Sequence, residues 1–102
     1  MKLLFIIIII MGKEERAQEK LLEEEIARLE KEEKNLRKLA SEAFLKGIEC
    51  EKKARKEKNP SKAQEYLQEM AGWNETGAAY EESANKIGRE ITELQQELLK
   101  KF

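Results

Sequence analysis

With the single exception of Glu33, a small or apolar residue returns every three or four positions through most of this 102-residue chain, and this regularity limits the fold more than any other feature. The first series is Leu22, Ile26, Leu29, Glu33, Leu36, Ala40, Ala43, Gly47, Cys50 and Ala54. The second series is Ala63, Tyr66, Met70, Trp73, Gly77, Tyr80, Ala84, Ile87, Ile91, Leu94 and Leu98. Steps that alternate between three and four residues predict α-helices packed side by side at a shallow angle.

The two series are separated by the only proline of the chain, Pro60. Proline cannot continue a helix, and it disfavours the helical conformation at the residue before it, Asn59. Ser61 offers a side-chain oxygen to cap a new helix, with Gln64 or Glu65 close to capping-box spacing. One helix should therefore end just before the proline and another should begin just after it.

These signals predict an all-α fold, a long antiparallel helical hairpin of the coiled-coil kind with a projecting apolar N-terminal arm. We expect a helix at about 13–58, a turn at 59–60 and a second helix at about 61–101. In this division residues 1–12 form the arm and residues 13–102 form the hairpin.

Folding the chain at this turn predicts which residues face each other across the seam between the helices. The opposed pairs are Gly47 with Trp73, Ala43 with Gly77, Ala40 with Tyr80, Leu36 with Ala84, Leu29 with Ile91, Ile26 with Leu94, and Leu22 with Leu98. Each aromatic residue faces a small one, as close packing requires. Glycine costs up to about 1 kcal/mol in a helix. Close approach accounts for Gly47 and Gly77, whereas Gly72 and Gly88 have no explanation unless further helices approach there.

The residue types of common catalytic and metal sites are missing from the sequence. The chain has no His, and all of its acidic residues are Glu. These absences exclude a Ser-His-Asp triad and a Glu-x-x-His di-iron site. There is no glycine-rich phosphate loop, and consecutive glutamates on a helix do not converge on one ion. We therefore expect a protein that is not an enzyme and that binds no cofactor, metal or small-molecule substrate.

Two residues of the first series carry side chains that could do chemistry. Glu33 lies near Ile87, where we expect it to bend toward water and pair with Lys86 or Arg89, or to fix the register of the helices. Cys50 suits a small buried position. Since it is the only cysteine, it could alternatively form a disulfide between two copies of the chain in an oxidising compartment.

Charge is distributed unevenly, although the totals of 20 basic and 21 acidic residues nearly balance. The near balance argues against a nucleic-acid partner. The turn end of the hairpin is basic, and we call this group of residues the basic tip: Lys52, Lys53, Arg55, Lys56, Lys58 and Lys62. Bases at the end of a helix complement the helix dipole, which is one explanation. The other is that the basic tip contacts an anionic surface.

Further apolar side chains lie beside the two series. The predicted lateral interface consists of Leu39, Phe44, Ile48, Leu67 and Ala71. A wide apolar face usually means that more than two helices pack together. Either two hairpins form a four-helix bundle, or one hairpin docks into a larger assembly, so we expect a protein partner or a second copy of the chain.

The predicted anchor is the N-terminal run of apolar residues Leu3, Leu4, Phe5, Ile6, Ile7, Ile8, Ile9, Ile10 and Met11. As a helix, nine residues are roughly 14 Å long, about half the hydrocarbon thickness of a bilayer. The run resembles the core of a signal peptide in length, but no A-x-A-like cleavage site follows it. Three alternatives stay open: burial in a membrane or membrane complex, removal as a signal from a secreted or extracytoplasmic protein, and self-association.

From these observations we expect a membrane-associated structural or accessory subunit, a hairpin tethered by its apolar arm to a membrane or a membrane protein complex. The alternative is a soluble coiled-coil adaptor that self-associates into a four-helix bundle and uses the basic tip for recognition.

Overall fold

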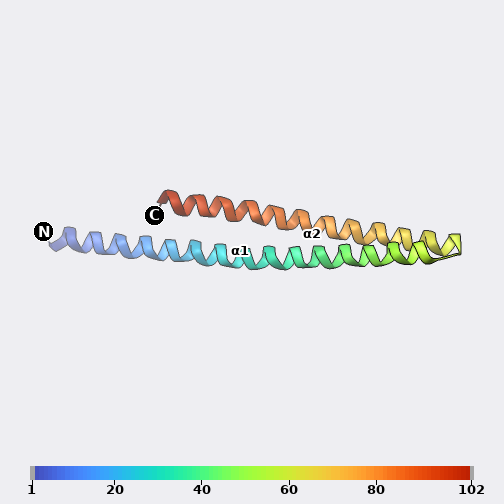
Figure 1. Cartoon of the computed structure of the whole chain (residues 1–102). Coiled ribbons are helices and arrows are strands. Elements are labelled where there is room, and N and C mark those ends of the chain that lie inside the picture. Colours follow the sequence, from blue (N-terminus) through green and yellow to red (C-terminus); the bar gives the residue numbers. More distant parts are fainter. Residues whose placement is uncertain (1, 102) are drawn as a thin grey trace.

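The computed structural model is an antiparallel hairpin of two long helices, which confirms the predicted all-α fold (Figure 1). The backbone is described for residues 2–101 and the side chains for residues 14–101. Helix α1 spans Lys2–Lys56 and helix α2 spans Pro60–Lys101, so α1 ends slightly before the predicted boundary. The Cα trace measures 88 × 15 × 13 Å along its principal axes, which makes the molecule a rod two helices thick.

Asn59 caps the N-terminus of α2, so the prediction that Ser61 is the cap was wrong. Asn59 Oδ1 accepts a hydrogen bond from the backbone N–H of Ser61 at 2.9 Å. The Asn59 carbonyl accepts the N–H of Ala63 at 3.0 Å, so Asn59 is the N-cap and Pro60 is the first helical residue. Proline is favoured at this first position because its missing N–H would have no partner there and its φ angle already suits a helix.

Contacts across the seam follow the predicted pairing closely. In the open half of the rod, away from the turn, the core consists of Ile26, Leu29 and Ile91, with Ile87, Leu94 and Leu98 packed against it. Toward the turn, Cys50 contacts Glu69, and the Lys46 ammonium lies 4.4 Å from the centre of the Trp73 ring. Every position of the two predicted series is buried or half-buried, so the spacing located the seam correctly.

Two glycines allow close approach in the turn half of the rod, and the nearest side chains to both come from the edge of the seam. A methyl group at Gly77 would lie 2.8 Å from the ring of Phe44, so Phe44 covers this glycine. At Gly47 a methyl group would lie 2.6 Å from Oδ1 of Asn74, and Trp73 is not among the nearest groups. Side chains just outside the seam therefore fold inward over both glycines.

The other two glycines are not held by close contacts of this kind. A methyl group at Gly88 would lie 3.5 Å from the Glu33 carboxylate, an ordinary van der Waals distance. Gly72 has nothing within 4 Å of the place where a methyl group would sit. Within the described hairpin, neither glycine is required by helix packing.

Candidate interaction surfaces

The predicted anchor, Leu3 to Met11, has side chains that lie outside the described residues. Its role therefore stays a prediction. Among the residues described, neither helix offers a stretch both long enough and apolar enough to cross a membrane.

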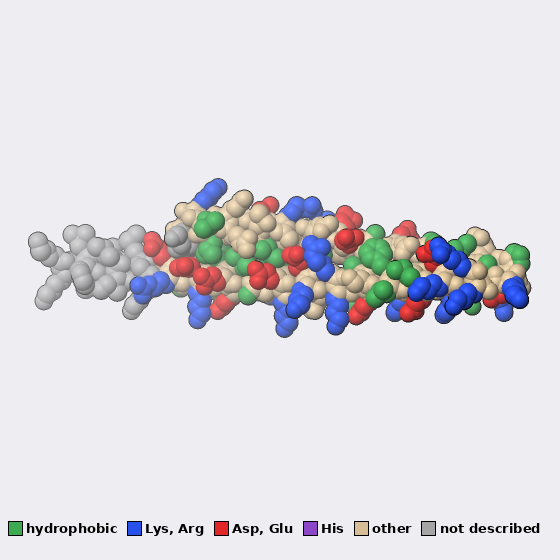
Figure 2. Space-filling view, viewed as in Figure 1, with side chains coloured by type: hydrophobic (Ala, Val, Ile, Leu, Met, Phe, Trp, Pro, Cys, Tyr) green, Lys and Arg blue, Asp and Glu red, His purple; other side chains and the backbone are tan. Residues whose placement is uncertain are grey.

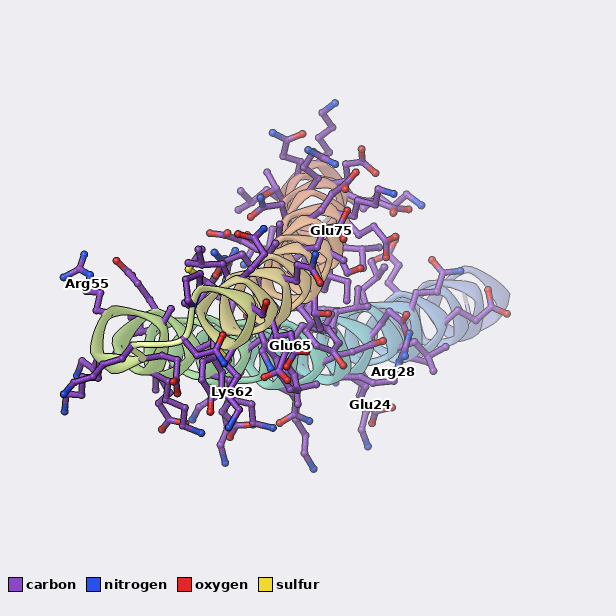
Figure 3. The ribbon with its side chains drawn as sticks, turned by 90° about the vertical axis from the view of Figure 1, so that its right-hand side faces the viewer. Glu24, Arg28, Arg55, Lys62, Glu65 and Glu75 are labelled. Atoms are coloured by element: carbon purple, nitrogen blue, oxygen red, sulfur yellow. The ribbon has the colours of Figure 1, made fainter. Side chains whose placement is uncertain are left out.

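The basic tip is exposed at the turn end of the rod, and all six of its side chains face solvent. Lys and Arg side chains gather toward this end of the molecule (Figure 2). Arg55 forms an ion pair with Glu51 at 2.6 Å, and Lys53 lies 6.0 Å from the centre of the Tyr66 ring. Arg55 and Lys62 point away from the rod in different directions (Figure 3). The tip is a diffuse positive surface, suited to attracting an anionic partner rather than to enclosing one anion.

Lys53, Arg55 and Lys56 occupy the last turn of α1, where the helix dipole is negative. The backbone N–H of Glu57 returns to the Lys53 carbonyl at 3.0 Å, which closes this final turn. Stabilisation of the helix end by these bases is therefore compatible with the structure, and so is contact with a partner.

Glu33 forms its ion pair within its own helix, and the expected partners Lys86 and Arg89 were wrong. Arg37 Nε donates to Glu33 Oε1 at 3.1 Å, and Arg37 Nη2 donates to Asn85 Oδ1 of α2 at 3.3 Å. Residues four apart on one helix face each other directly, so Arg37 reaches the carboxylate first. The result is a polar link across the seam, beside a shallow surface groove lined by Arg37, Asn85, Gly88, Arg89, Thr92 and Glu93.

Cys50 is buried in the seam, where only 6% of its surface is exposed. Its thiol donates a hydrogen bond to Glu69 Oε2 at 3.7 Å. Burial raises the pKa of the Cys50 thiol, and the hydrogen bond to the Glu69 carboxylate raises this pKa further. The thiol is thus a poor nucleophile at neutral pH, and a disulfide between two copies would require the seam to open.

The predicted lateral interface does not form one continuous surface. Leu39 and Ile48 are nine residues apart on α1, and at about 100° per residue they lie on opposite sides of the helix. Phe44 is half-buried over Gly77 and belongs partly to the seam. The exposed fractions are 40% for Leu39, 46% for Ile48 and 39% for Leu67.

Asparagines are the polar residues that the sequence pattern did not single out. Asn74 lies over Gly47, and Asn85 accepts a hydrogen bond from Arg37. Each directly follows a seam residue of α2, Trp73 or Ala84. This position next to the seam is the feature of the sequence from which their contacts with α1 could have been predicted.

Within the part of the chain that the structure describes, no three side chains of His, Cys, Asp or Glu come together in a way that could hold a metal ion. No family model matches the chain, and no curated protein or solved structure matches it either.

Proposed function

We propose that this protein is a non-enzymatic structural or accessory subunit, a helical hairpin that its apolar N-terminal arm tethers to a membrane or a membrane protein complex. The observation that carries the proposal is the run of nine apolar residues from Leu3 to Met11, which adjoins a segment whose described side chains are mostly exposed. Within the described structure, α1 continues beyond the C-terminal end of α2 (Figure 1). The described part of α2 therefore places no residues opposite this run.

The energetics of the run support burial outside the hairpin. Each of its nine side chains contributes roughly 1–2 kcal/mol on transfer from water, so the total is large even after losses from ordering. The adjoining segment is acidic, with nine acids and four bases at residues 14–33, and anionic lipids would repel it. Attachment should therefore be hydrophobic in origin and should resist high salt.

The test is membrane flotation of the full-length protein with vesicles of a neutral phospholipid. We expect the protein to float with the vesicles in high salt and to leave them in detergent. Replacing Ile7 and Ile9 with Glu should release it, because two carboxylates would have to be desolvated.

A matched control keeps the number of added charges constant. Replacing Leu21 and Leu45 with Glu changes two side chains of the rod that are already 65% and 59% exposed, so membrane binding should persist. Full-length protein that stays monodisperse in buffer without detergent or vesicles contradicts the tether.

The second candidate is a soluble coiled-coil adaptor that self-associates and recognises an anionic partner through the basic tip. The exposed apolar side chains Ile48 and Leu67 favour it, because they remain uncovered on the isolated hairpin. This candidate predicts that the full-length protein does not float with the neutral vesicles, whereas the tether predicts that it does.

A further inference from the structure

Helix α2 carries a second line of residues, beside the seam, that is almost free of charge. We call it the α2 stripe, and its members are Gln64, Leu67, Ala71, Asn74, Ala78, Glu81, Asn85, Gly88, Thr92, Gln95 and Leu99. Steps of three and four residues place all eleven on one side of the helix. Ten of them are exposed and Gly88 is half-buried, yet Glu81 is the only charged member in a chain that is 40% charged.

The opposite side of α2 shows what an ordinary solvated face of this protein looks like. Its positions are Lys62, Glu65, Glu69, Gly72, Thr76, Ala79, Ser83, Lys86, Glu90, Glu93, Glu97 and Lys100, and eight of these twelve are charged. Both sides have the same seam neighbour, α1. The difference between them sets the α2 stripe apart from the charged, solvated side of the same helix.

We propose that the α2 stripe is a homodimer interface, in which the stripe of one copy packs antiparallel on the same stripe of a second copy. In the proposed register the following residues face each other: Leu67 and the partner's Leu99, Ala71 and the partner's Gln95, Asn74 and the partner's Thr92, Ala78 and the partner's Gly88, and Glu81 and the partner's Asn85. The symmetry axis passes beside Ser83.

This register places side chains of suitable size against each other. Near its centre, Ala78 meets the partner's Gly88, the smallest pair in the interface, so the helices can approach closely there. Leucines close both ends, where Leu99 is 82% exposed in the single hairpin. The Thr92 hydroxyl already donates to the Gly88 carbonyl at 3.0 Å, so it needs no partner across the interface.

The charges favour an antiparallel arrangement of the two helices, and they favour a second copy of this chain as the partner that packs on the α2 stripe. A parallel stripe in register would place Glu81 on the partner's Glu81, and like charges would repel. In the antiparallel register, Glu81 meets the partner's Asn85. Since Asn85 Oδ1 accepts a hydrogen bond from Arg37, its amide N–H₂ can donate to that carboxylate. At the edge of the stripe, Glu75 comes beside the partner's Arg89 on both sides of the symmetry axis, and the one like-charged contact there is Glu82 with the partner's Glu82.

The size of the contact sets the strength of the dimer. From Leu67 to Leu99 the stripe is about 48 Å long, and an α-helix is about 10–12 Å wide. The contact then covers roughly 500 Å² per copy, or about 1,000 Å² in total, which is near the lower limit of specific interfaces. We therefore infer a reversible dimer. The open ends of its two hairpins lie at opposite ends of the assembly, so segments that precede residue 14 leave in opposite directions.

Disulfide trapping tests the register in the full-length chain, in mild detergent and with Cys50 replaced by Ala. Ala71→Cys protein is mixed with Gln95→Cys protein and treated with diamide, and the products are identified by mass. We expect heterodimers well in excess of either homodimer. The control pair, Thr76→Cys with Glu90→Cys, is centred on the same residue, Ser83, but lies on the opposite side of α2 and should remain monomeric. Predominant Ala71→Cys homodimers, or trapping no better than in the control pair, would overturn the proposal.

A charge substitution tests the interface independently of cysteine chemistry. Ala78→Glu adds a carboxylate at the centre of the stripe, and Ala79→Glu adds one on the charged side. Both positions are exposed, so the hairpin should keep its helicity in each variant. Sedimentation of the full-length variants in mild detergent should show dimerisation weakened at least about tenfold by Ala78→Glu and unaffected by Ala79→Glu. Equal dimerisation of the two variants would refute the interface. The proposal does not depend on what the N-terminal arm binds.

Discussion

Replacing Gly77 with Ala tests the packing of the turn half of the rod most directly. Two effects oppose each other at this position. Alanine stabilises a helix by up to about 1 kcal/mol relative to glycine. However, the new methyl group would lie 2.8 Å from Cε1 of Phe44 and 2.9 Å from Cδ1 and Cζ, so the ring would have to move. Overpacking of this kind costs about 1–3 kcal/mol, and we therefore expect Gly77→Ala to lie between neutral and about 2 kcal/mol destabilising.

Gly72→Ala provides the matched comparison, because a methyl group there meets nothing within 4 Å. It should stabilise the hairpin by about 0.5–1 kcal/mol through helix propensity alone. The two variants should thus differ by about 1–3 kcal/mol, which is measurable as separate thermal transitions by circular dichroism, at roughly 4–8 °C per kcal/mol. Replacing the Phe44 ring by a smaller side chain, in a Phe44→Leu, Gly77→Ala double variant, should recover part of the lost stability. If Gly77→Ala stabilises the protein as much as Gly72→Ala does, Phe44 does not cover Gly77.

Three further predictions follow from local features of the hairpin. Asn59→Ala should lower the free energy of unfolding by about 1 kcal/mol because it removes the cap of α2, whereas Ser61→Ala should change it little; equal effects in urea denaturation would contradict the assignment. The raised pKa of Cys50 means that the folded state disfavours the thiolate. Stability should therefore decline as the pH rises above the unfolded thiol value of about 8.5, and alkylation should be much slower in the folded than in the unfolded protein. Changing Lys52, Lys53, Lys56 and Lys58 to Gln should leave helicity nearly unchanged; if the basic tip binds anionic vesicles, binding should weaken and lose most of its salt dependence.

The seam of the hairpin was predictable because it depends on two features that the sequence displays openly. A strict spacing of three and four residues sets which side of each helix is buried, and one proline sets where the chain reverses. Together they fix the pairing of Leu29 with Ile91 closely enough that both side chains are found buried in one core. Such features determine positions along the rod rather than side-chain conformations.

Contacts made by side chains at the edge of the seam were not predictable in the same way. Phe44 and Asn74 each fold over a glycine of the facing helix, and this choice depends on rotamers that residue spacing does not determine. The ion pair of Glu33 with Arg37 depends on competition among several nearby bases. The separation of Leu39 from Ile48 is different, because counting 100° per residue along the sequence already places them on opposite sides of α1.

The unequal distribution of core residues along the rod connects the fold to the proposed dimer. The open half buries large side chains such as Ile26, Leu29 and Ile91. In the turn half the buried residues are small, among them Ala43 and Gly77, and a large side chain such as Trp73 is only half-buried. Hydrophobic stabilisation grows with the apolar area removed from water, so the half-buried side chains leave part of this stabilisation unrealised in the single hairpin. A second helix over Ala71 and Ala78 would add burial in this half, where small exposed residues allow another helix to approach closely.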